Sequence, residues 1–202
     1  MSAAKKQKTE EGKAGGAGDI LLGLELNEER YVTLLTKLIG EVEQLQNNPP
    51  ALVPKEDLAA RHVMDALKPY TEESGGPLKL EHITYVEGRG NLIITYPGKT
   101  DKTVAFVGSH MDAVPADPSG WEVDPFKLTR KGDQLYGRGT TDSLGHVALI
   151  TELFTQLAET KPDLDVSVVA VFIASEEAAS IPPNAGVEGL VAAGKLAHLK
   201  VR

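Results

Sequence analysis

The amino-acid sequence predicts an α/β protein in which a largely parallel sheet is packed between helices. Two observations favour this fold class. Strand-like and helix-like segments alternate along the second half of the chain, which is the order that builds parallel sheets. Two of the strand-like segments are apolar almost throughout, as expected of strands covered on both faces, namely TVAFVG (103–108) and VSVVAVFIA (166–174).

The composition narrows the class of protein further. The chain has 202 residues, of which 41% are hydrophobic and 25% charged, as is usual for a soluble globular domain with a sizeable core. The net charge of −8 carries no long run of one sign, which argues against nucleic acid or an anionic membrane as the main partner. Because the chain contains no cysteine, a metal site would have to use His, Asp and Glu side chains.

The N-terminal residues 1–19 are expected to form a disordered tail, because their Lys, Glu, Gly and Ala residues cannot bury a core. The tail has neither the apolar segment of a secretory signal nor the acid-poor composition of a transit peptide. No apolar stretch approaches the roughly 20 residues of a membrane span. We therefore expect a cytoplasmic protein whose residues 20–202 form the folded part.

Two helices are expected at the start of the folded part. Asn27 resembles an N-cap followed by an acidic first turn, and an apolar stripe then recurs at helical spacing up to Leu45. The sequence NNPP ends this helix, because proline cannot continue it. A second helix is expected from about Pro54 to Leu67, just before the next proline.

The rest of the chain is expected to supply the sheet and its crossover helix. Two strands, 80–86 and 91–97, are separated by EGRG, which predicts a turn or hairpin. The apolar strand 103–108 follows them. The remaining predictions are a helix, a deeply apolar strand and a last helix, over residues 141–160, 166–174 and 186–200.

Five polar residues stand where these elements end or begin. His110 and Asp112 follow one apolar strand, Glu176 and Glu177 follow another, and Asp142 opens the long helix. Ligand sites of such sheets lie outside the carboxyl ends of the strands, so these side chains are expected to meet. An imidazole nitrogen with carboxylate oxygens is a suitable ligand set for a divalent cation.

Each residue alone also has an ordinary interpretation. Asp142 could be only a helix cap, His110 a hydrogen-bonded histidine at a strand end, and the Glu176–Glu177 pair a solvated loop. Two adjacent acids directly after a deeply apolar strand, however, repel each other unless a cation or a proton intervenes. Taken together, the three groups favour a metal site. His146, one helical turn after Asp142, is interpreted as an ordinary surface or packing histidine.

In this order and spacing, VGSHMDAVP, YGRGTTDSLGHVALITEL and VFIASEE resemble the dinuclear zinc amidohydrolases, and the resemblance extends over about residues 27–202. It implies two Zn²⁺ ions per complete site, for which Co²⁺ can substitute. His110 and Glu177 would each bind one ion, and Asp142 would bridge both. Glu176 would be the general base, and Asp112 would orient the imidazole of His110.

The resemblance also implies a fold and a reaction. The chain would be the N-terminal portion of a zinc-aminopeptidase-like catalytic domain, and the reaction would hydrolyse the amide bond of a small N-acyl amino acid. One segment is most similar to family members that convert N-acetylornithine to ornithine and acetate in arginine biosynthesis, namely the sequence GWEVDPFKLTRKGDQLYGRG. Desuccinylase, aminoacylase and dipeptidase activities remain alternatives.

Family members are longer than this chain, and many are homodimers. They carry a further metal-binding acid, a last metal-binding histidine and a lid and dimerisation domain, all expected to be absent here. The second class of function is therefore a catalytically inactive fragment that acts at most as a metal-binding or interaction module. In either case, a partial α/β layer is expected to leave apolar surface exposed.

Overall fold

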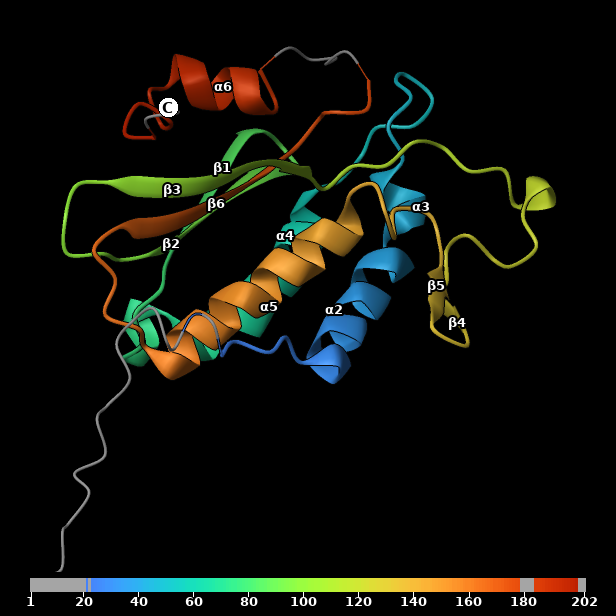
Figure 1. Ribbon diagram of the computed structural model, residues 1–202. Helices are drawn as coiled ribbons and strands as arrows, with labels where there is room; N and C mark the ends of the chain where they lie inside the picture. Colours follow the sequence, from blue (N-terminus) through green and yellow to red (C-terminus); the bar gives the residue numbers. More distant parts are fainter. Residues whose placement is uncertain (1–20, 22, 179–183, 200–202) are drawn as a thin grey trace, which may run out of the picture.

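The structure is a computed structural model that describes residues 21, 23–178 and 184–199. The tail predicted over residues 1–19 lies outside these described residues. A four-stranded sheet forms the centre of the molecule, with most of the helices on one face and a single short helix on the other (Figure 1). The predicted α/β class is therefore confirmed. None of the helices in the described part of the chain combines the length and the apolar character needed to cross a membrane.

The first helical region is two helices rather than one. Helix α2 (Glu28–Gly40) begins after Asn27, whose side chain accepts a hydrogen bond from the backbone N–H of Arg30 as predicted for an N-cap. The helix ends at Gly40, and α3 (Val42–Leu45) continues the apolar stripe for one more turn. Helix α4 (Asp57–Leu67) occupies the second predicted position, and two short 3-10 turns follow it, η1 (Lys68–Tyr70) and η2 (Glu72–Ser74).

The sheet contains β1 (Lys79–Val86), β2 (Arg89–Tyr96), β3 (Thr103–His110) and β6 (Ser167–Ile173) in the spatial order β1-β2-β6-β3. β1 with β2 and β2 with β6 are antiparallel, and only β3 with β6 is parallel. The prediction of a largely parallel sheet was therefore wrong. The chain reverses through Gly88, whose φ of 80° suits the tight turn of the β1–β2 hairpin, so β2 enters the sheet in the opposite direction.

Burial also differs between the two strands expected to be covered on both faces. β6 is central and largely buried, as predicted. β3 lies at the edge of the sheet, and it exposes apolar side chains, Val104 by 50%, Phe106 by 40% and Val107 by 46%. The prediction for β3 was thus wrong, because an apolar run shows strand preference but not which neighbours the strand has. Some apolar surface is exposed, as expected of a partial layer.

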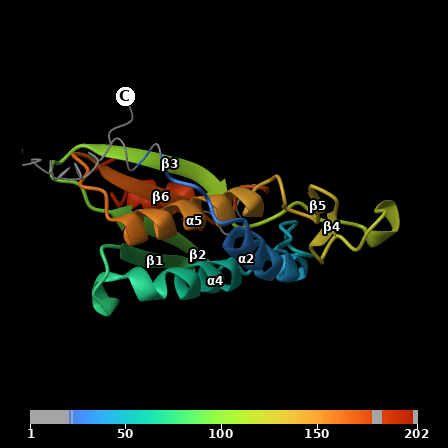
Figure 2. The same cartoon turned by 60° about the horizontal axis from the view of Figure 1, so that its bottom comes forward.

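Helix α5 (Leu144–Thr160) is the crossover between the two parallel strands and starts three residues later than predicted. It lies with α4 and α2 on one face of the sheet, and Figures 1 and 2 show α4 along β1 and β2 and α5 along β6 and β3. This face holds the larger core. The smaller core on the opposite face joins β2 and β6 to Leu190 of α6 (Val187–Ala192).

Two details of the second half differ from the prediction. The last helix was expected over 186–200 but ends at Ala192, because Gly194 adopts a left-handed φ of 67° that terminates it. A small hairpin of β4 (Thr129–Lys131) and β5 (Gln134–Tyr136) was not expected. It lies in the long connection between β3 and α5, together with the 3-10 turn η3 (Pro118–Gly120).

The edge position of β3 can be tested with two identical substitutions, because Val107 and Val171 are paired in register on neighbouring strands. Val171 is fully buried and Val107 is 46% exposed. We expect Val171→Ala to lower the free energy of unfolding by about 2 kcal/mol. The loss caused by Val107→Ala should be smaller than this by about 1 kcal/mol or more. Urea denaturation measures both, and equal losses would contradict the edge position.

Candidate metal centre

The predicted site residues meet where the parallel strands β3 and β6 end. His110 is the last residue of β3, and the next backbone N–H, of Met111, donates to the carbonyl of Ile173 at the end of β6 at 2.9 Å. Glu176 and Glu177 follow β6 at the same edge. The two strands are parallel, so their carboxyl ends lie side by side. This single parallel pairing is enough to bring the imidazole and the two acids together.

Asp142 is held at the same edge of the sheet because the next residue, Ser143, contacts the backbone of His110. Ser143 is buried, and its hydroxyl accepts a hydrogen bond from the backbone N–H of His110 at 2.9 Å and lies 3.2 Å from the carbonyl of His110. Ser143 is the N-cap residue of α5, but its side chain makes no capping hydrogen bond. The interpretation of Asp142 as a simple helix cap therefore fails, because its side chain contacts His110 instead.

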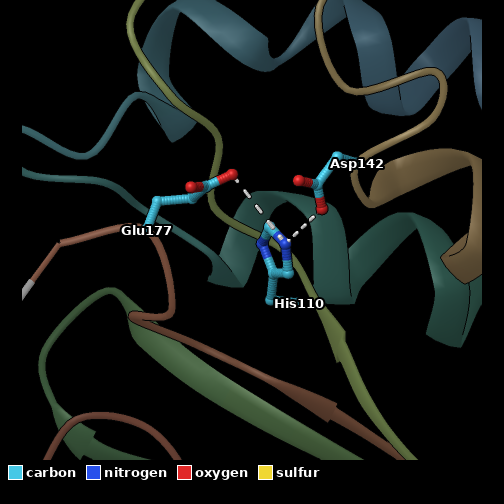
Figure 3. Close-up of side chains that lie close together, drawn as sticks. All are labelled: His110, Asp142 and Glu177. Atoms are coloured by element: carbon cyan, nitrogen blue, oxygen red, sulfur yellow. Dashed lines mark hydrogen bonds and ion pairs between the residues drawn. The ribbon is translucent and has the colours of Figure 1, made fainter.

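Three side chains of different elements point toward one another at this edge (Figure 3). Nε2 of His110 lies 2.9 Å from Oδ1 of Asp142 and 3.9 Å from Oε1 of Glu177. One ligand atom from each residue lies within 4.8 Å of the other two, which is compact enough to surround one ion. The imidazole is buried, whereas the side chain of Asp142 is 74% exposed, so the cluster opens to solvent on the Asp142 side.

Asp112 lies behind this cluster, and its carboxylate is completely buried. Nδ1 of His110 lies 3.0 Å from the backbone carbonyl of Asp112 and 3.2 Å from its Oδ1. Both atoms are acceptors, so Nδ1 must carry a proton, and the lone pair of a neutral imidazole is left on Nε2, toward Asp142 and Glu177. The other oxygen of Asp112 accepts hydrogen bonds from the side-chain amide of Asn47 and the backbone N–H groups of Glu176 and Glu177.

Glu176 lies beside the cluster rather than within it. Its Oε2 is 3.8 Å from Nε2 of His110, and its side chain is 51% exposed. The side chain of Glu177 is only 13% exposed. The two adjacent acids therefore occupy different positions, one turned into the cluster and the other at its solvent side.

The electrostatics of the cluster favour a positive charge. Burial lowers the pKa of His110, but hydrogen bonds with Asp112 and Asp142 outweigh burial and raise this pKa to about 9. Burial and the neighbouring acids raise the pKa of Glu177. A proton on the imidazole thus balances the carboxylates, and a divalent cation would compete with that proton for Nε2.

The remaining histidines do not join the cluster. His62 pairs with Glu41 at 2.9 Å, His82 pairs with Asp57 at 2.9 Å, and His146 lies exposed on α5. Sequence reasoning missed the buried polar residues that support the site from behind, which are Asn47, Glu56, Arg89 and Asn91. Arg89 and Asn91 stand at the start of strand β2, directly before its apolar residues, and this position was the available signal.

The pKa of His110 should fall when Asp112 loses its charge. Asp112→Asn removes the carboxylate that stabilises the protonated imidazole, so His110 should titrate well below pH 9. Titration of the imidazole C–H resonances by NMR in the presence of EDTA measures this shift. A His110 resonance that titrates at the same pH in both proteins would show that Asp112 does not set the charge state of the ring.

Comparison with known proteins identifies relatives of this chain. The chain is 57% identical over 177 residues to an acetylornithine deacetylase of Arabidopsis thaliana, an alignment that covers 87% of this chain and 40% of that protein. It is 55% identical over 181 residues to an acetylornithine deacetylase of Dictyostelium discoideum, over 85% of this chain and 40% of that protein. The chain therefore spans about two fifths of the length of these relatives.

Solved structures share the fold. The crystal structure of human carnosine dipeptidase 1 superposes with a TM-score of 0.66 at 23% identity, over 91% of this chain and 38% of that one. Residues 106–201, which include all five predicted site residues, match the peptidase family M20/M25/M40. The chain is thus a homologue of the acetylornithine deacetylases over the part that it spans, and its residues 106–201 match peptidase family M20/M25/M40.

Proposed function

We propose that this chain carries part of the metal centre of an amidohydrolase that cleaves the amide bond of an N-acyl amino acid. The observation that carries the proposal is the convergence of His110, Asp142 and Glu177, whose ligand atoms lie within 4.8 Å of one another. The match of residues 106–201 to a peptidase family supports the same class of reaction, because peptidases and amidohydrolases cleave the same kind of bond.

The residues present fit zinc. Imidazole nitrogen and carboxylate oxygen are both zinc ligands, and His110, Asp142 and Glu177 would supply them. Co²⁺ accepts the same ligands and can substitute. When bound, the ion polarises the acyl carbonyl and lowers the pKa of a bound water. Asp142 is the most exposed of the three ligands, and we assign to it the bridge to a second ion.

The two adjacent acids would have different roles, one as a metal ligand and the other as the general base. Glu177, whose side chain is turned into the cluster, would bind one ion, and His110 would bind the other. Glu176 lies near the imidazole but stays half exposed, so its carboxylate can take a proton from the attacking water and deliver it to the leaving amine. Asp112 keeps Nε2 of His110 directed at the ion and holds the backbone of both acids.

N-acetylornithine is the substrate that we favour, with acetate and ornithine as products. The 57% identity extends over 87% of this chain and is shared with a protein that is named for this reaction. Dipeptide hydrolysis is the alternative within the same fold, since human carnosine dipeptidase 1 has a similar structure. The alternative outside enzymes is a metal-binding or interaction module with the same ligands.

Metal binding is the first test. The purified chain should bind at least one Zn²⁺ per molecule when the metal content is measured after dialysis, and His110→Ala should remove most of it, because only two carboxylates remain. His146→Ala is the matched control, because it removes an exposed imidazole one helical turn from Asp142. Equal zinc content in all three proteins would contradict the assigned ligands.

Hydrolysis is the second test. The zinc-loaded chain should release acetate from N-acetylornithine faster than it hydrolyses N-succinyl-diaminopimelate or carnosine. Glu176→Gln should lower kcat by about 10²–10⁴-fold with unchanged zinc content, because it removes the proton acceptor but no ligand. Zinc-loaded protein that releases no acetate above a zinc-only blank would instead support the metal-binding module.

A further inference from the structure

The backbone that carries Glu176 and Glu177 is held by buried side chains rather than by strand pairing. Four consecutive N–H groups after β6 each donate to a side-chain oxygen at 3.0 to 3.1 Å. The donors are Ala174, Ser175, Glu176 and Glu177, and the acceptors are Asn91, Glu56 and, for the last two, Asp112. The segment is therefore positioned from three separate parts of the fold.

Ser175 is the bend of this segment. Its φ is 58°, a left-handed conformation that costs free energy for a residue with a side chain and persists only where the surroundings impose it. The bend turns the chain away from β6, so that the two following acids approach His110. The N–H of Ser175 donates to Oε1 of Glu56 at 3.0 Å, and this hydrogen bond fixes the bend.

Glu56 is itself held by Arg89. Both side chains are buried, with exposures of 0% and 1%, and the guanidinium donates to both carboxylate oxygens, Nε to Oε2 at 3.0 Å and Nη2 to Oε1 at 2.6 Å. Glu56 precedes α4 and Arg89 opens β2. Among the residues that the structure describes, Arg89 is the only Lys or Arg that is buried. The pair thus joins helix α4, strand β2 and the bend.

Stability alone does not account for this pair. Replacing a buried ion pair with apolar side chains of similar volume is often neutral or stabilising, because the desolvation of two charges offsets their attraction. An apolar pair, however, has no oxygen to accept the N–H of Ser175. The ion pair, unlike an apolar pair, supplies a charged and fixed acceptor for the N–H of Ser175.

We propose that Glu56, held in place by Arg89, is a positioning residue for the metal centre. It fixes the bend at Ser175, and through the bend it sets where the carboxylates of Glu176 and Glu177 stand relative to His110. The inference rests on the proposed function for its effect on metal binding. Its effect on the backbone of the bend does not depend on that function.

The test replaces the pair with apolar residues, in the double variant Glu56→Leu with Arg89→Met. The matched control is Arg30→Met with Glu152→Leu, because Arg30 donates to both oxygens of the buried Glu152 in the same bidentate way between α2 and α5, away from the site. Amide hydrogen exchange without metal, zinc affinity by competition with a chelator, and the visible spectrum of the Co²⁺-loaded protein are measured for both.

We expect the amide of Ser175 to exchange roughly tenfold faster or more in the Glu56/Arg89 variant, because it loses a charged acceptor. Zinc affinity should fall about 10–100-fold, and the Co²⁺ bands should shift as the ligand geometry changes. The Arg30/Glu152 control should leave all three unchanged, whatever it does to the urea midpoint. Unchanged exchange, affinity and spectrum in the Glu56/Arg89 variant would overturn the proposal.

A second variant covers the case in which the double variant does not fold. Glu56→Gln keeps the volume but removes the charge of the acceptor and places an NH2 group against a guanidinium N–H of Arg89, so the exchange of Ser175 should still rise. If the unsubstituted chain binds no zinc, the proposed function fails, and exchange at Ser175 alone decides whether Glu56 positions the bend. If zinc binds but Ser175 exchanges equally in all variants, only the role of Glu56 fails.

Discussion

The buried carboxylate of Asp112 is the interaction on which the site depends. A carboxylate can be buried only when its oxygens are surrounded by donors. Asp112 obtains them from Asn47, the ring of His110 and the backbone of Glu176 and Glu177. Burial acts to raise the pKa of Asp112, but these donors outweigh it and lower this pKa, so the group stays ionised. One anion therefore orients the histidine and holds the turn that carries both glutamates.

The topology of the sheet explains why two parallel strands are enough to bring the cluster residues together. Only β3 and β6 are parallel, and α5 is the crossover between them, so one β-α-β unit supplies every residue of the cluster. The antiparallel β1–β2 hairpin contributes from behind, through Arg89 and Asn91. The exposed apolar side chains of β3 lie on the outer edge of this unit, and the cluster opens on the side of Asp142.

The convergence of His110, Asp142 and Glu177 could be predicted from the sequence, because each stands near the end of a strongly apolar strand or the start of a long helix. The antiparallel pairing of β2 with β6 could not, because the EGRG turn indicated a β1–β2 hairpin but not which strand would lie on the other side of β2. Burial of β3 could not either, since it depends on neighbours distant in the sequence. No sequence pattern singles out Glu56, and only the folded chain brings Arg89 and the N–H of Ser175 to it.

The most direct measurement of the central claim is a crystal structure of the chain grown with Zn²⁺, with anomalous diffraction recorded at the zinc edge. The account predicts anomalous density at this cluster, with an ion about 2.0–2.2 Å from Nε2 of His110 and from a carboxylate oxygen of Asp142. A peak at other residues, or none at this cluster in a zinc-saturated crystal, would contradict it.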